Sequence, residues 1–338
     1  MNSVGTGSWV PPRDLQAERL TVVACTPHYF GDDYVKPFDV PKELGIDLSC
    51  NFSTDQALLD KADACWFHAP SITRLPKEKK QPWILMSMES DRNWPILANP
   101  EVLGRFDLHM TYRLDSDVPA LYPNWKQYGD FRRPPIPVDG KSKRSPAVYI
   151  ASNPVAYRDA YVRRLMAHMP IDALGSCLNN RSIAGFVRRG NARCKGGFAS
   201  ILDVLPGYKF YLAFENSLSR DYVTERLFHA LAAGTVPVYC GAENIDDFLP
   251  GDNAVINVRD FAGPRELADY LLYLDQDDQA YQRYLEWKDR NYCASFERLL
   301  DIGTIDPLHR MAVKLAHRCP GTCTCGGRLR ARPQEIDP

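Results

Sequence analysis

Short apolar runs separated by polar stretches mark the first 130 residues as an α/β domain. Three runs have the length and apolar content of buried strands: LTVVAC at 20–25, ADACWFHAP at 62–70 and PWILMSME at 82–89. Between the first two, DQALLDKA at 55–62 has the composition of a helix. Strands that alternate with helices predict a parallel sheet, so this half of the chain is predicted to be doubly wound.

A second series of strands and helices follows a polar segment. AVYIAS at 147–152 predicts a strand, RDAYVRRLMAHM at 158–169 a helix, and PIDALG at 170–175 a short strand. FYLAF at 210–214 and TVPVYCG at 235–241 predict two more strands. The pattern therefore predicts a second parallel sheet, in which the last two strands flank a helix as a βαβ unit.

The helix of this βαβ unit is predicted to begin at Asp221 and to end at Gly234. Aspartate is a favoured residue at a helix N-cap, and glycine is common just after a helix C-terminus. Two further helices are predicted at 264–288 and 308–318, and the last is expected to pack back across both domains. The apolar stripe of the βαβ helix, at helical spacing, consists of Val223, Leu227, Ala230 and Leu231.

The chain is long enough to form two domains, each with its own core. Its 338 residues exceed the usual size of a single domain. The segment FRRPPIPVDGKSKRSP at 131–146 combines four prolines with a basic run and lacks apolar periodicity, which is typical of a linker. We therefore predict an N-terminal domain at 18–140, a C-terminal domain at 146–295, and a helix with a cysteine-rich tail at 296–338.

The charge balance excludes some classes of partner. The chain carries 41 basic and 42 acidic residues, for a net charge of −1. Neither nucleic acid nor an anionic membrane surface is therefore expected as the main partner. Any phosphate group that the protein binds must be held by a few local residues.

Ten cysteines, an even number, favour an oxidising compartment of the secretory pathway. Asn51 and Asn180 each begin an N-glycosylation sequon, which adds modest weight. Residues 1–20 contain neither the apolar core of a signal peptide nor a membrane-spanning run. We therefore expect either a membrane anchor that is missing from this chain or a naturally soluble enzyme.

The turn between strand 210–214 and its helix collects polar side chains that suit a nucleotide diphosphate. A helix N-terminus in a βαβ unit points free N–H groups at the crevice and favours an anion. Arg226 can add a positive charge there, Glu225 can accept hydrogen bonds from ribose hydroxyls, and Asn216 and Tyr222 add further hydrogen-bonding groups. The alternative is a solvated first turn that merely suits a helix terminus. The chain has neither a GxGxxG nor a GxxxxGKS/T motif, so dinucleotide and P-loop sites are not supported.

Two segments of this region, FENSLSRDYVTER at 214–226 and AAGTVPVYCGAENIDDF at 232–248, closely resemble the signature of the α1,3-fucosyltransferases. The resemblance extends to YIASNPVAYRDAYVRRL at 149–165 and covers the chain from residue 60 to residue 290. That family transfers fucose from GDP-fucose to glycans that contain N-acetylglucosamine. The resemblance implies a GT-B fold of two doubly wound, Rossmann-like domains facing a cleft, with the donor bound by the second domain.

The resemblance also assigns the donor site. In the family's motif, the positions of Asn216, Tyr222, Glu225 and Arg226 contact GDP-fucose, and an arginine at the position of Arg158 faces the phosphates. The position of Arg226 is usually lysine, and arginine keeps the charge but binds through a longer, forked group. GDP-fucose is the implied donor substrate with no required cofactor or metal, and Mg²⁺ or Mn²⁺ are stimulants through the product nucleotide.

Glu89 is the predicted catalytic base. Inverting transfer needs one base to take the proton of the acceptor hydroxyl, whereas a glycosidase ordinarily needs two carboxylates. Glu89 ends the apolar strand at 82–89 beside Met86, Met88 and Trp83, where burial is expected to raise its pKa. Its position also matches the catalytic base of the family. The alternative is a strand-end carboxylate that caps the next turn.

Three residues after the strand region of the first domain match another family motif. Arg113, Ser116 and Asp117 are expected either to contact the acceptor or to brace the first domain against the second. Asp115, Ser116 and Asp117 imitate the DxD metal motif of other glycosyltransferases, but the resemblance implies no metal there. Trp94 is a further acceptor-site candidate, because an indole ring can stack on a sugar face.

The C-terminal run RCPGTCTCGG holds Cys319, Cys323 and Cys325. A zinc site with His317 is the alternative to disulfides, which are favoured because the spacing is not that of a standard finger. In the family, a C-terminal cysteine pair is often tied to the N-terminal region, for which Cys25 and Cys50 are candidates. Cys177 and Cys194 bracket a short loop and form another candidate pair.

The first domain is expected to decide the acceptor. MESDRNWP at 88–95 and SDVPALYPNW at 116–125 resemble the branch that fucosylates the innermost N-acetylglucosamine of N-glycans more than the Lewis-type branch. We therefore expect an inverting α1,3-fucosyltransferase acting on the N-glycan core, with Lewis-type transfer to LacNAc or LacdiNAc as the alternative. An inactive GDP-sugar or glycan binder and a transferase for another nucleotide sugar are the rival hypotheses.

Partners and location follow from the same resemblance. It implies GDP-fucose and an N-glycan or glycoprotein acceptor as partners, with no nucleic acid. It places the chain in the Golgi lumen as the catalytic domain of a type II membrane protein whose anchor is missing here, with a soluble form as the alternative.

Overall fold

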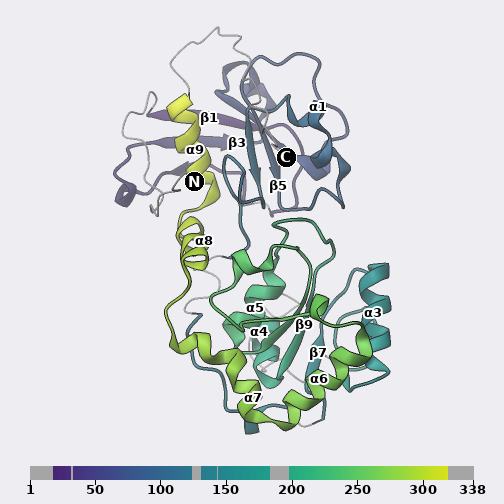
Figure 1. The fold of residues 1–338 in the computed structure, drawn as a ribbon. Coiled ribbons are helices and arrows are strands. Elements are labelled where there is room, and N and C mark those ends of the chain that lie inside the picture. Colours follow the sequence, from purple (N-terminus) through teal and green to yellow (C-terminus); the bar gives the residue numbers. More distant parts are fainter. Residues whose placement is uncertain (1–17, 32, 124–130, 143, 183–197, 319–338) are drawn as a thin grey trace, which may run out of the picture.

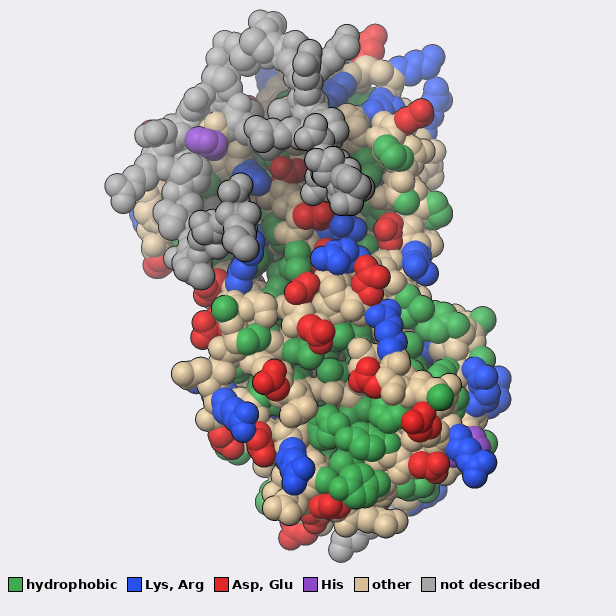
Figure 2. Space-filling model, in the orientation of Figure 1, with side chains coloured by type: hydrophobic (Ala, Val, Ile, Leu, Met, Phe, Trp, Pro, Cys, Tyr) green, Lys and Arg blue, Asp and Glu red, His purple; other side chains and the backbone are tan. Residues whose placement is uncertain are grey.

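The computed structural model describes residues 18–31, 33–123, 131–142, 144–182 and 198–318. Within them the chain forms two α/β domains, one above the other in Figure 1, each built around its own sheet. Acidic and basic side chains are interspersed over the face shown in Figure 2, as expected from the net charge of −1. No helix among the described residues is long and apolar enough to cross a membrane.

The N-terminal domain is built on a six-stranded sheet. Its strands are β1 (Arg19–Ala24), β2 (Phe38–Asp39), β3 (Ser49–Ser53), β4 (Ala64–His68), β5 (Trp83–Ser87) and β6 (Leu108–Thr111). Their order across the sheet is β2-β3-β1-β4-β5-β6, and all are parallel except β2, which pairs antiparallel with β3 at one edge. The three apolar runs predicted as strands in this half are thus β1, β4 and β5.

Short helices join most of these strands. Residues 55–62, predicted as a helix, form the 3₁₀ helix η2 (Gln56–Lys61), whose first turn is capped by Asp55. The chain returns to an extended conformation at Ala62, so the segment does not become an α-helix. The other short helices are η1 (Lys42–Leu44), η3 (Ala69–Ser71), η4 (Pro95–Ala98) and the one-turn α1 (Pro100–Leu103).

The C-terminal domain contains a five-stranded parallel sheet. Its strands are β7 (Ala147–Tyr149), β8 (Ile171–Ala173), β9 (Phe210–Phe214), β10 (Val236–Cys240) and β11 (Ile256–Asn257). They lie in the order β11-β10-β9-β7-β8. All five residues of β9 are buried, as expected for an apolar run in a sheet that is covered on both faces.

Helices cover both faces of this sheet. The α-helices are α3 (Ala156–Met166), α4 (Phe198–Val204), α5 (Glu225–Ala233), α6 (Pro264–Gln276) and α7 (Asp278–Gln282). The 3₁₀ helices are η5 (Val138–Gly140), η7 (Leu205–Gly207), η8 (Ile245–Phe248), η9 (Val258–Asp260) and η10 (Arg283–Asp289). Leu227 and Leu231 of α5 belong to one core cluster, whereas Val162 of α3 and Leu271 of α6 belong to the cluster on the other face.

The segment predicted as one helix at 264–288 is divided into α6, α7 and η10. Asp277 makes the first break, because its backbone is extended and its side chain caps α7. The Asp277 carboxylate accepts a hydrogen bond from the backbone N–H of Ala280 at 2.9 Å. Side-chain capping therefore outweighs the continuous helical periodicity of the sequence here.

Two C-terminal helices connect the domains. Figure 1 shows α8 (Ala294–Thr304) and α9 (Pro307–Arg318), drawn in yellow-green, running from the second domain to the first. Phe296 of α8 lies in the core of the second domain, whereas Met311 and Leu315 of α9 lie in the core of the first. The helix predicted at 308–318 is α9, and it completes the N-terminal core.

The segment predicted as a linker at 131–146 is packed against the second domain. The Phe131 ring is fully buried and contacts Phe296 edge to face, with ring centroids 5.6 Å apart. Lys141 is also buried, and its Nζ donates to the backbone oxygens of Tyr208 at 3.1 Å and Gly234 at 3.2 Å. The prolines and basic residues of this segment therefore form a strap on the domain surface rather than a free tether.

In one of the two sequons, the asparagine side chain is hydrogen-bonded to the backbone of β8. The Asn180 side chain accepts from the backbone N–H of Ala173 at 2.8 Å and donates to the backbone oxygen of Ile171 at 2.9 Å. A glycan would replace one of the two hydrogens on Nδ2, next to the bond to Ile171, and would leave the Oδ1 acceptor in place. Asn51 lies within β3, opposite Thr21 of β1. The Asn180 sequon therefore gives less support to a location in the secretory pathway than its sequence suggests.

The cysteines of the described residues are free thiols: Cys25, Cys50, Cys65, Cys177, Cys240 and Cys293. Cys194 and the tail cysteines Cys319, Cys323 and Cys325 lie outside the described residues. The predicted disulfides that involve them stay predictions, and so does the zinc alternative.

Candidate active site

The predicted base and the predicted donor motif meet at the junction of the two domains. Glu89 lies two residues after the end of β5, and the polar stretch 215–224 leads from the end of β9 into α5. The Tyr222 hydroxyl donates to Glu89 Oε2 at 3.4 Å, although the two residues belong to different domains. Two parallel sheets thus turn the carboxyl ends of β5 and β9 toward each other, which is where open α/β sheets bind ligands.

Two further hydrogen bonds cross the same junction. Asn93 Nδ2 donates to Asn216 Oδ1 at 3.2 Å, and Ser219 Oγ donates to Asp91 Oδ1 at 2.6 Å. The first bond is exposed, and the second is partly buried. The loop after β5 therefore contacts the loop after β9 along its length, and Asn216, a predicted donor contact, faces the first domain.

Tyr222 sits among aromatic side chains of the first domain. Its ring meets those of Tyr112 and Tyr122 edge to face, with ring centroids 5.1 and 6.3 Å away. Tyr122 is held in place by donating to the backbone oxygen of Met88 at 2.6 Å. Burial, together with the negative charge of Glu89, raises the pKa of Tyr222 well above its ordinary value. Tyr222 therefore keeps its proton and acts as a hydrogen-bond donor.

The helix α5 begins later than predicted. Thr224, not Asp221, is its N-cap, and the Thr224 hydroxyl accepts from the backbone N–H of Arg226 at 3.4 Å. Glu225 and Arg226 are thus the first two residues of the helix, and Gly234 ends it in the left-handed conformation as predicted. The predicted donor contacts consequently flank a helix N-terminus, where backbone N–H groups favour an anion.

Asp221 organises the loop before this helix instead of capping it. Its backbone has a φ of 63°, a left-handed conformation that aspartate tolerates better than most residues. Its backbone N–H donates to Asn244 Oδ1 at 2.9 Å, and its carboxylate accepts from Asn244 Nδ2 at 2.8 Å. The other carboxylate oxygen accepts from the backbone N–H of Leu114 in the first domain at 3.3 Å. Asp221 therefore fixes the loop and ties it to the opposite domain.

Glu215 is a site residue that the sequence reasoning missed. It follows β9 directly and is fully buried. Its carboxylate accepts from the Thr224 backbone N–H at 2.8 Å and from the Thr224 hydroxyl at 2.7 Å, and lies 3.3 Å from Arg226 Nη1. Burial raises the pKa of Glu215 to about 7, with the Arg226 charge acting in the opposite direction. The only signal in the sequence is a carboxylate that closes an apolar strand in FENS.

Arg226 lies between two carboxylates. Its Nη1 is 3.3 Å from Glu215 Oε2 and 3.6 Å from Glu225 Oε1, and it donates to the Thr224 hydroxyl at 3.0 Å. These contacts fix the guanidinium at the start of α5. They also partly neutralise it, so any anion that binds here shares Arg226 with Glu215 and Glu225.

Arg158 is a buried cation with unsatisfied hydrogen-bond donors. It lies in the first turn of α3 with 1% of its surface exposed, and its Nη2 donates to the backbone oxygen of Asn153 at 2.6 Å. Its Nε is 3.6 Å from Asp159 Oδ1. Within the described part of the chain, Nε and Nη1 make no hydrogen bond. Because buried polar groups are nearly always satisfied, a bound anion is the natural partner of this guanidinium.

The starts of α3 and α5 lie near each other. The Tyr157 hydroxyl, in the first turn of α3, donates to the backbone oxygen of Glu215 at 2.6 Å. β7 and β9, which precede these helices, are neighbours in the sheet. Two helix N-termini and the two arginines, Arg158 and Arg226, thus surround the carboxyl end of β9, an arrangement suited to a diphosphate.

Arg113 and Trp94 lie on the first-domain side of the junction. Arg113 makes a forked contact with Asp115, with Nε 2.9 Å from one carboxylate oxygen and Nη2 3.0 Å from the other. This contact occupies the guanidinium within its own turn. Trp94 precedes η4 and is 36% exposed, and its acceptor role stays a prediction.

Ser116 and Asp117 hold the turn after β6. The Ser116 hydroxyl is hydrogen-bonded to that of Thr111, and Asp117 Oδ2 accepts from the backbone N–H of His109 at 2.9 Å. Asp117 Oδ1 also lies 3.8 Å from Lys314 Nζ of α9. These contacts hold the turn within the first domain, and both the acceptor role and the bracing role of Ser116 and Asp117 stay predictions. Among the residues that the structure describes, no group of three or more His, Cys, Asp or Glu side chains is placed to hold a metal ion.

Two family models match the chain. The model described as "Fucosyltransferase, N-terminal" matches residues 28–123, and the model described as "Glycosyltransferase family 10 (fucosyltransferase) C-term" matches residues 140–312. The two matches fall on the two structural domains, and the second continues through α8 into α9.

Curated relatives carry a more specific name. "GDP-fucose protein O-fucosyltransferase 3" of Gallus gallus is 39% identical over 222 residues, and that of Homo sapiens is 35% identical over the same number. Each match covers 63% of this chain and 46% of the relative. The match to the Danio rerio protein of that name, 34% identical, covers 68% and 51%. The chain therefore spans about half the length of these relatives. The predicted closeness to the N-glycan core branch is not confirmed by them.

Solved structures share the fold. An α1,3-fucosyltransferase with GDP-fucose aligns over 91% of this chain and 94% of its own, with a TM-score of 0.58 at 18% identity. The structure with GDP covers 94% and 96%, with a TM-score of 0.57. The predicted α/β architecture of two domains with parallel sheets is thus confirmed.

Proposed function

The chain belongs to glycosyltransferase family 10, the fucosyltransferases, and from this premise we propose that it transfers fucose from GDP-fucose to a hydroxyl group of a protein. The observation that carries the proposal is the 3.4 Å contact between Glu89 and Tyr222. This contact supports a carboxylate that acts at the donor motif, and Arg226 follows Tyr222 by four residues, at the start of α5.

Each site residue has a role in this reaction. Glu89 takes the proton of the acceptor hydroxyl while the oxygen attacks the anomeric carbon of fucose, and the configuration at that carbon inverts. Arg158 and Arg226, with the N-termini of α3 and α5, stabilise the negative charge that develops on the leaving GDP. Tyr222 donates a hydrogen bond at the reacting centre, and Glu225 accepts from the ribose hydroxyls.

The names of the relatives support a polypeptide hydroxyl as the acceptor. They are called protein O-fucosyltransferases, and the two fucosyltransferase family models match both sides of the junction. A second candidate acceptor is the innermost N-acetylglucosamine of N-glycans, in α1,3 linkage. Its support is the resemblance of residues 88–95 and 116–125 to the core branch, and Trp94 in the first segment is exposed at the junction. Lewis-type transfer to LacNAc is the remaining alternative.

The compartment is also a proposal. We propose that the enzyme acts in the lumen of the secretory pathway, and the Golgi is the predicted compartment. The support is the number of cysteines, ten, in a chain of 338 residues.

Labelled fucose separates the acceptors. Purified protein is incubated with labelled GDP-fucose and one of four acceptors: secreted proteins stripped of N-glycans, an N-glycan core glycopeptide, LacNAc, or none. Label on the stripped proteins that alkaline β-elimination releases would support the O-linked proposal. Transfer only to the core glycopeptide or only to LacNAc would replace it with the corresponding alternative.

The donor is tested separately. GDP should compete with GDP-fucose and UDP should not. The two nucleotides carry the same diphosphate, so the difference must come from the pocket that binds the guanine ring, which is distinct from the phosphate site. Equal competition by UDP would overturn the assignment of GDP-fucose as the donor. Undiminished transfer in Glu89→Gln would overturn the assignment of Glu89 as the catalytic base.

A further inference from the structure

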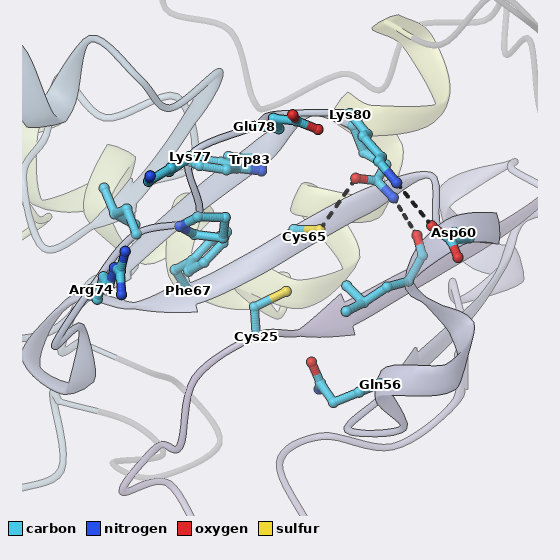
Figure 3. Close-up of a pocket in the computed structure, with 14 residues that line it drawn as sticks. Cys25, Gln56, Asp60, Cys65, Phe67, Arg74, Lys77, Glu78, Lys80 and Trp83 are labelled. Atoms are coloured by element: carbon cyan, nitrogen blue, oxygen red, sulfur yellow. Dashed lines mark hydrogen bonds and ion pairs between the residues drawn. The ribbon is translucent and has the colours of Figure 1, made fainter.

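A pocket of about 570 Å³ opens on one face of the N-terminal sheet, away from the residues assigned to fucosyl transfer. Cys25 and Cys65 both line it, and Figure 3 shows their side chains one above the other, on neighbouring segments of the chain. Its walls come from η2 and from residues 74–81. The basic side chains of Arg74, Lys77 and Lys80 line it together with Asp60 and Glu78.

The two cysteines come from neighbouring strands. Cys25 follows the last residue of β1, and its backbone N–H donates to the backbone oxygen of Trp66 in β4 at 2.8 Å. Cys65 lies in β4, opposite Val23 of β1. Successive residues of a strand point to opposite faces, so Val23 and Cys25 share the face on which Cys65 lies. The Cys25 thiol donates to the backbone oxygen of Val23 at 3.4 Å, and the two thiols lie close enough for each to shift the pKa of the other.

Packing separates this pair from the other nearby cysteine. Cys65 belongs to a small cluster with Phe67 and Trp83, and Cys25 packs against that cluster. Cys50 belongs instead to the large core cluster that α9 completes. The sheet therefore stands between Cys50 and the Cys25 thiol, although β3 and β1 are adjacent.

We propose that Cys25 and Cys65 are a reactive dithiol that closes to a disulfide by exchange with a low-molecular-weight disulfide entering this pocket. The Cys65 thiolate attacks one sulfur of the small disulfide and releases a thiol, which leaves a mixed disulfide on Cys65. Cys25 then loses its proton, attacks the Cys65 sulfur, and releases the second thiol. One small disulfide is reduced to two thiols while two cysteines are oxidised to one disulfide, so electrons and protons balance.

The surroundings distinguish the roles of the two sulfurs. The neighbouring Cys25 thiol lowers the pKa of Cys65, whereas Cys65 and burial raise the pKa of Cys25. The thiol with the lower pKa is the first to react, because the thiolate is the nucleophile. The Cys65 thiol also lies 3.7 Å from Gln81 Oε1, whose side chain donates to the backbone oxygen of Leu59 in η2. Oxidation removes this thiol donor and leaves Gln81 held by its bond to Leu59.

Peptide mapping tests the proposal on the full chain and does not depend on fucosyl transfer. The protein is reduced, exposed to oxidised glutathione, alkylated in denaturant and digested without reductant. A peptide pair linked through Cys25 and Cys65 is expected, together with a rise in melting temperature on the order of 5 °C that a reductant reverses. Alkylation of both cysteines, or linkage of either to Cys50 or to a tail cysteine, would overturn the proposal.

Single variants test the order of the steps. In Cys25→Ala, glutathione is expected to remain on Cys65 as a mixed disulfide, because the resolving thiol is gone. In Cys65→Ala, Cys25 is expected to be glutathionylated at least tenfold more slowly. Cys293→Ala serves as the matched control, and its Cys25–Cys65 linkage should form as in the unmodified chain. Equal glutathionylation of the two single variants would contradict the assigned roles.

Discussion

Each of the two domains has its own sheet of mainly parallel strands, but the domains differ in the structure that follows the strand ends. In the C-terminal domain, a carboxylate at the end of β9 is fully buried and holds the start of α5 through Thr224 and Arg226. In the N-terminal domain, short 3₁₀ helices connect most strands, and pockets of about 570, 640 and 240 Å³ open among its loops. The C-terminal domain has a pocket of about 500 Å³ between the end of α3 and the start of α6. One domain presents a fixed set of charges, and the other presents several open surfaces.

The difference corresponds to the two tasks of a transferase. A donor of constant chemistry is best bound by groups that are positioned before it arrives, because their ordering then costs nothing on binding. An acceptor that differs among relatives is better served by loops, which vary without disturbing a core. If this division is correct, substitutions at the C-terminal strand ends should affect GDP-fucose, and substitutions at the N-terminal ones should affect the acceptor or the chemical step.

The largest expected effect is that of Glu89→Gln on the chemical step. If Glu89 is the base, as proposed, its loss should lower the turnover number by about 10²- to 10⁴-fold while the dissociation constant for GDP stays within about twofold. Transfer rate and GDP binding by calorimetry measure the two quantities. Glu101→Gln, at an exposed position on α1, is the matched control and should leave both unchanged. If Glu89→Gln also lost GDP binding, the proposed division of tasks, with donor binding confined to the C-terminal domain, would be wrong.

The next effect is that of Arg158→Lys on donor binding. Lysine keeps the charge but lacks the forked donors, and its ammonium group is more costly to bury. We expect GDP affinity to fall by about tenfold to a hundredfold, the range for a lost hydrogen bond to a charged group. Arg163→Lys on the exposed face of α3 is the control. Unchanged GDP affinity in Arg158→Lys would show that another partner satisfies Nε and Nη1.

The same contrast explains which features were predictable from sequence. The strands β1, β4, β5 and β9 are short apolar runs, and burial on both faces of a sheet requires such runs whatever their neighbours are. The start of α5 was placed at Asp221, because the sequence does not reveal that Asn244 and Leu114 bind that residue. A helix was predicted at 55–62, but the segment forms only a short 3₁₀ helix. The chain becomes extended again at Ala62, two residues before β4 begins.

The site was predictable to a different degree on its two sides. Asn216, Tyr222, Glu225 and Arg226 belong to one continuous segment, so the family signature brings them together. Glu89 joined them only through resemblance, since no local pattern indicates that β5 ends opposite β9. Glu215 was missed because a strand-end glutamate is usually solvated, and its burial depends on Thr224, which lies beyond the loop.

A smaller effect is expected from the ionisation of Glu215. Burial raises the pKa of this carboxyl from 4.5 to about 7, so the folded protein keeps a proton between these pH values that the unfolded chain releases. The contribution of Glu215 to stability therefore falls as the pH rises from 4.5 to 7. Above pH 7 the ionised carboxylate competes with the diphosphate for Arg226. GDP-fucose affinity should therefore decrease from pH 6 to pH 8, by about tenfold at most because one proton is involved.

Glu215→Gln tests this assignment. GDP-fucose is a suitable probe because its diphosphate does not titrate in this range, and the measurement is made without acceptor. The variant should bind with little dependence on pH, near the affinity that the unmodified protein reaches at pH 6. Glu243→Gln, at a nearby exposed glutamate, should keep the original slope. An affinity that increases with pH in the unmodified protein would mean that the ionised form of Glu215 positions Arg226 instead.

The smallest effect concerns the contact that joins the two regions. Asp91 of the first domain accepts a hydrogen bond from Ser219 of the second at 2.6 Å. A double-mutant cycle with Asp91→Asn and Ser219→Ala should give a coupling energy of about 1 kcal/mol in the free energy of unfolding. Combining Ser219→Ala with Asp115→Asn is the control, and its coupling should be near zero because Asp115 is bound to Arg113. Zero coupling between Asp91 and Ser219 would mean that the domains do not stay docked in solution. The base and the donor motif would then meet only when a ligand closes the junction, and preorganisation would be confined to the C-terminal domain.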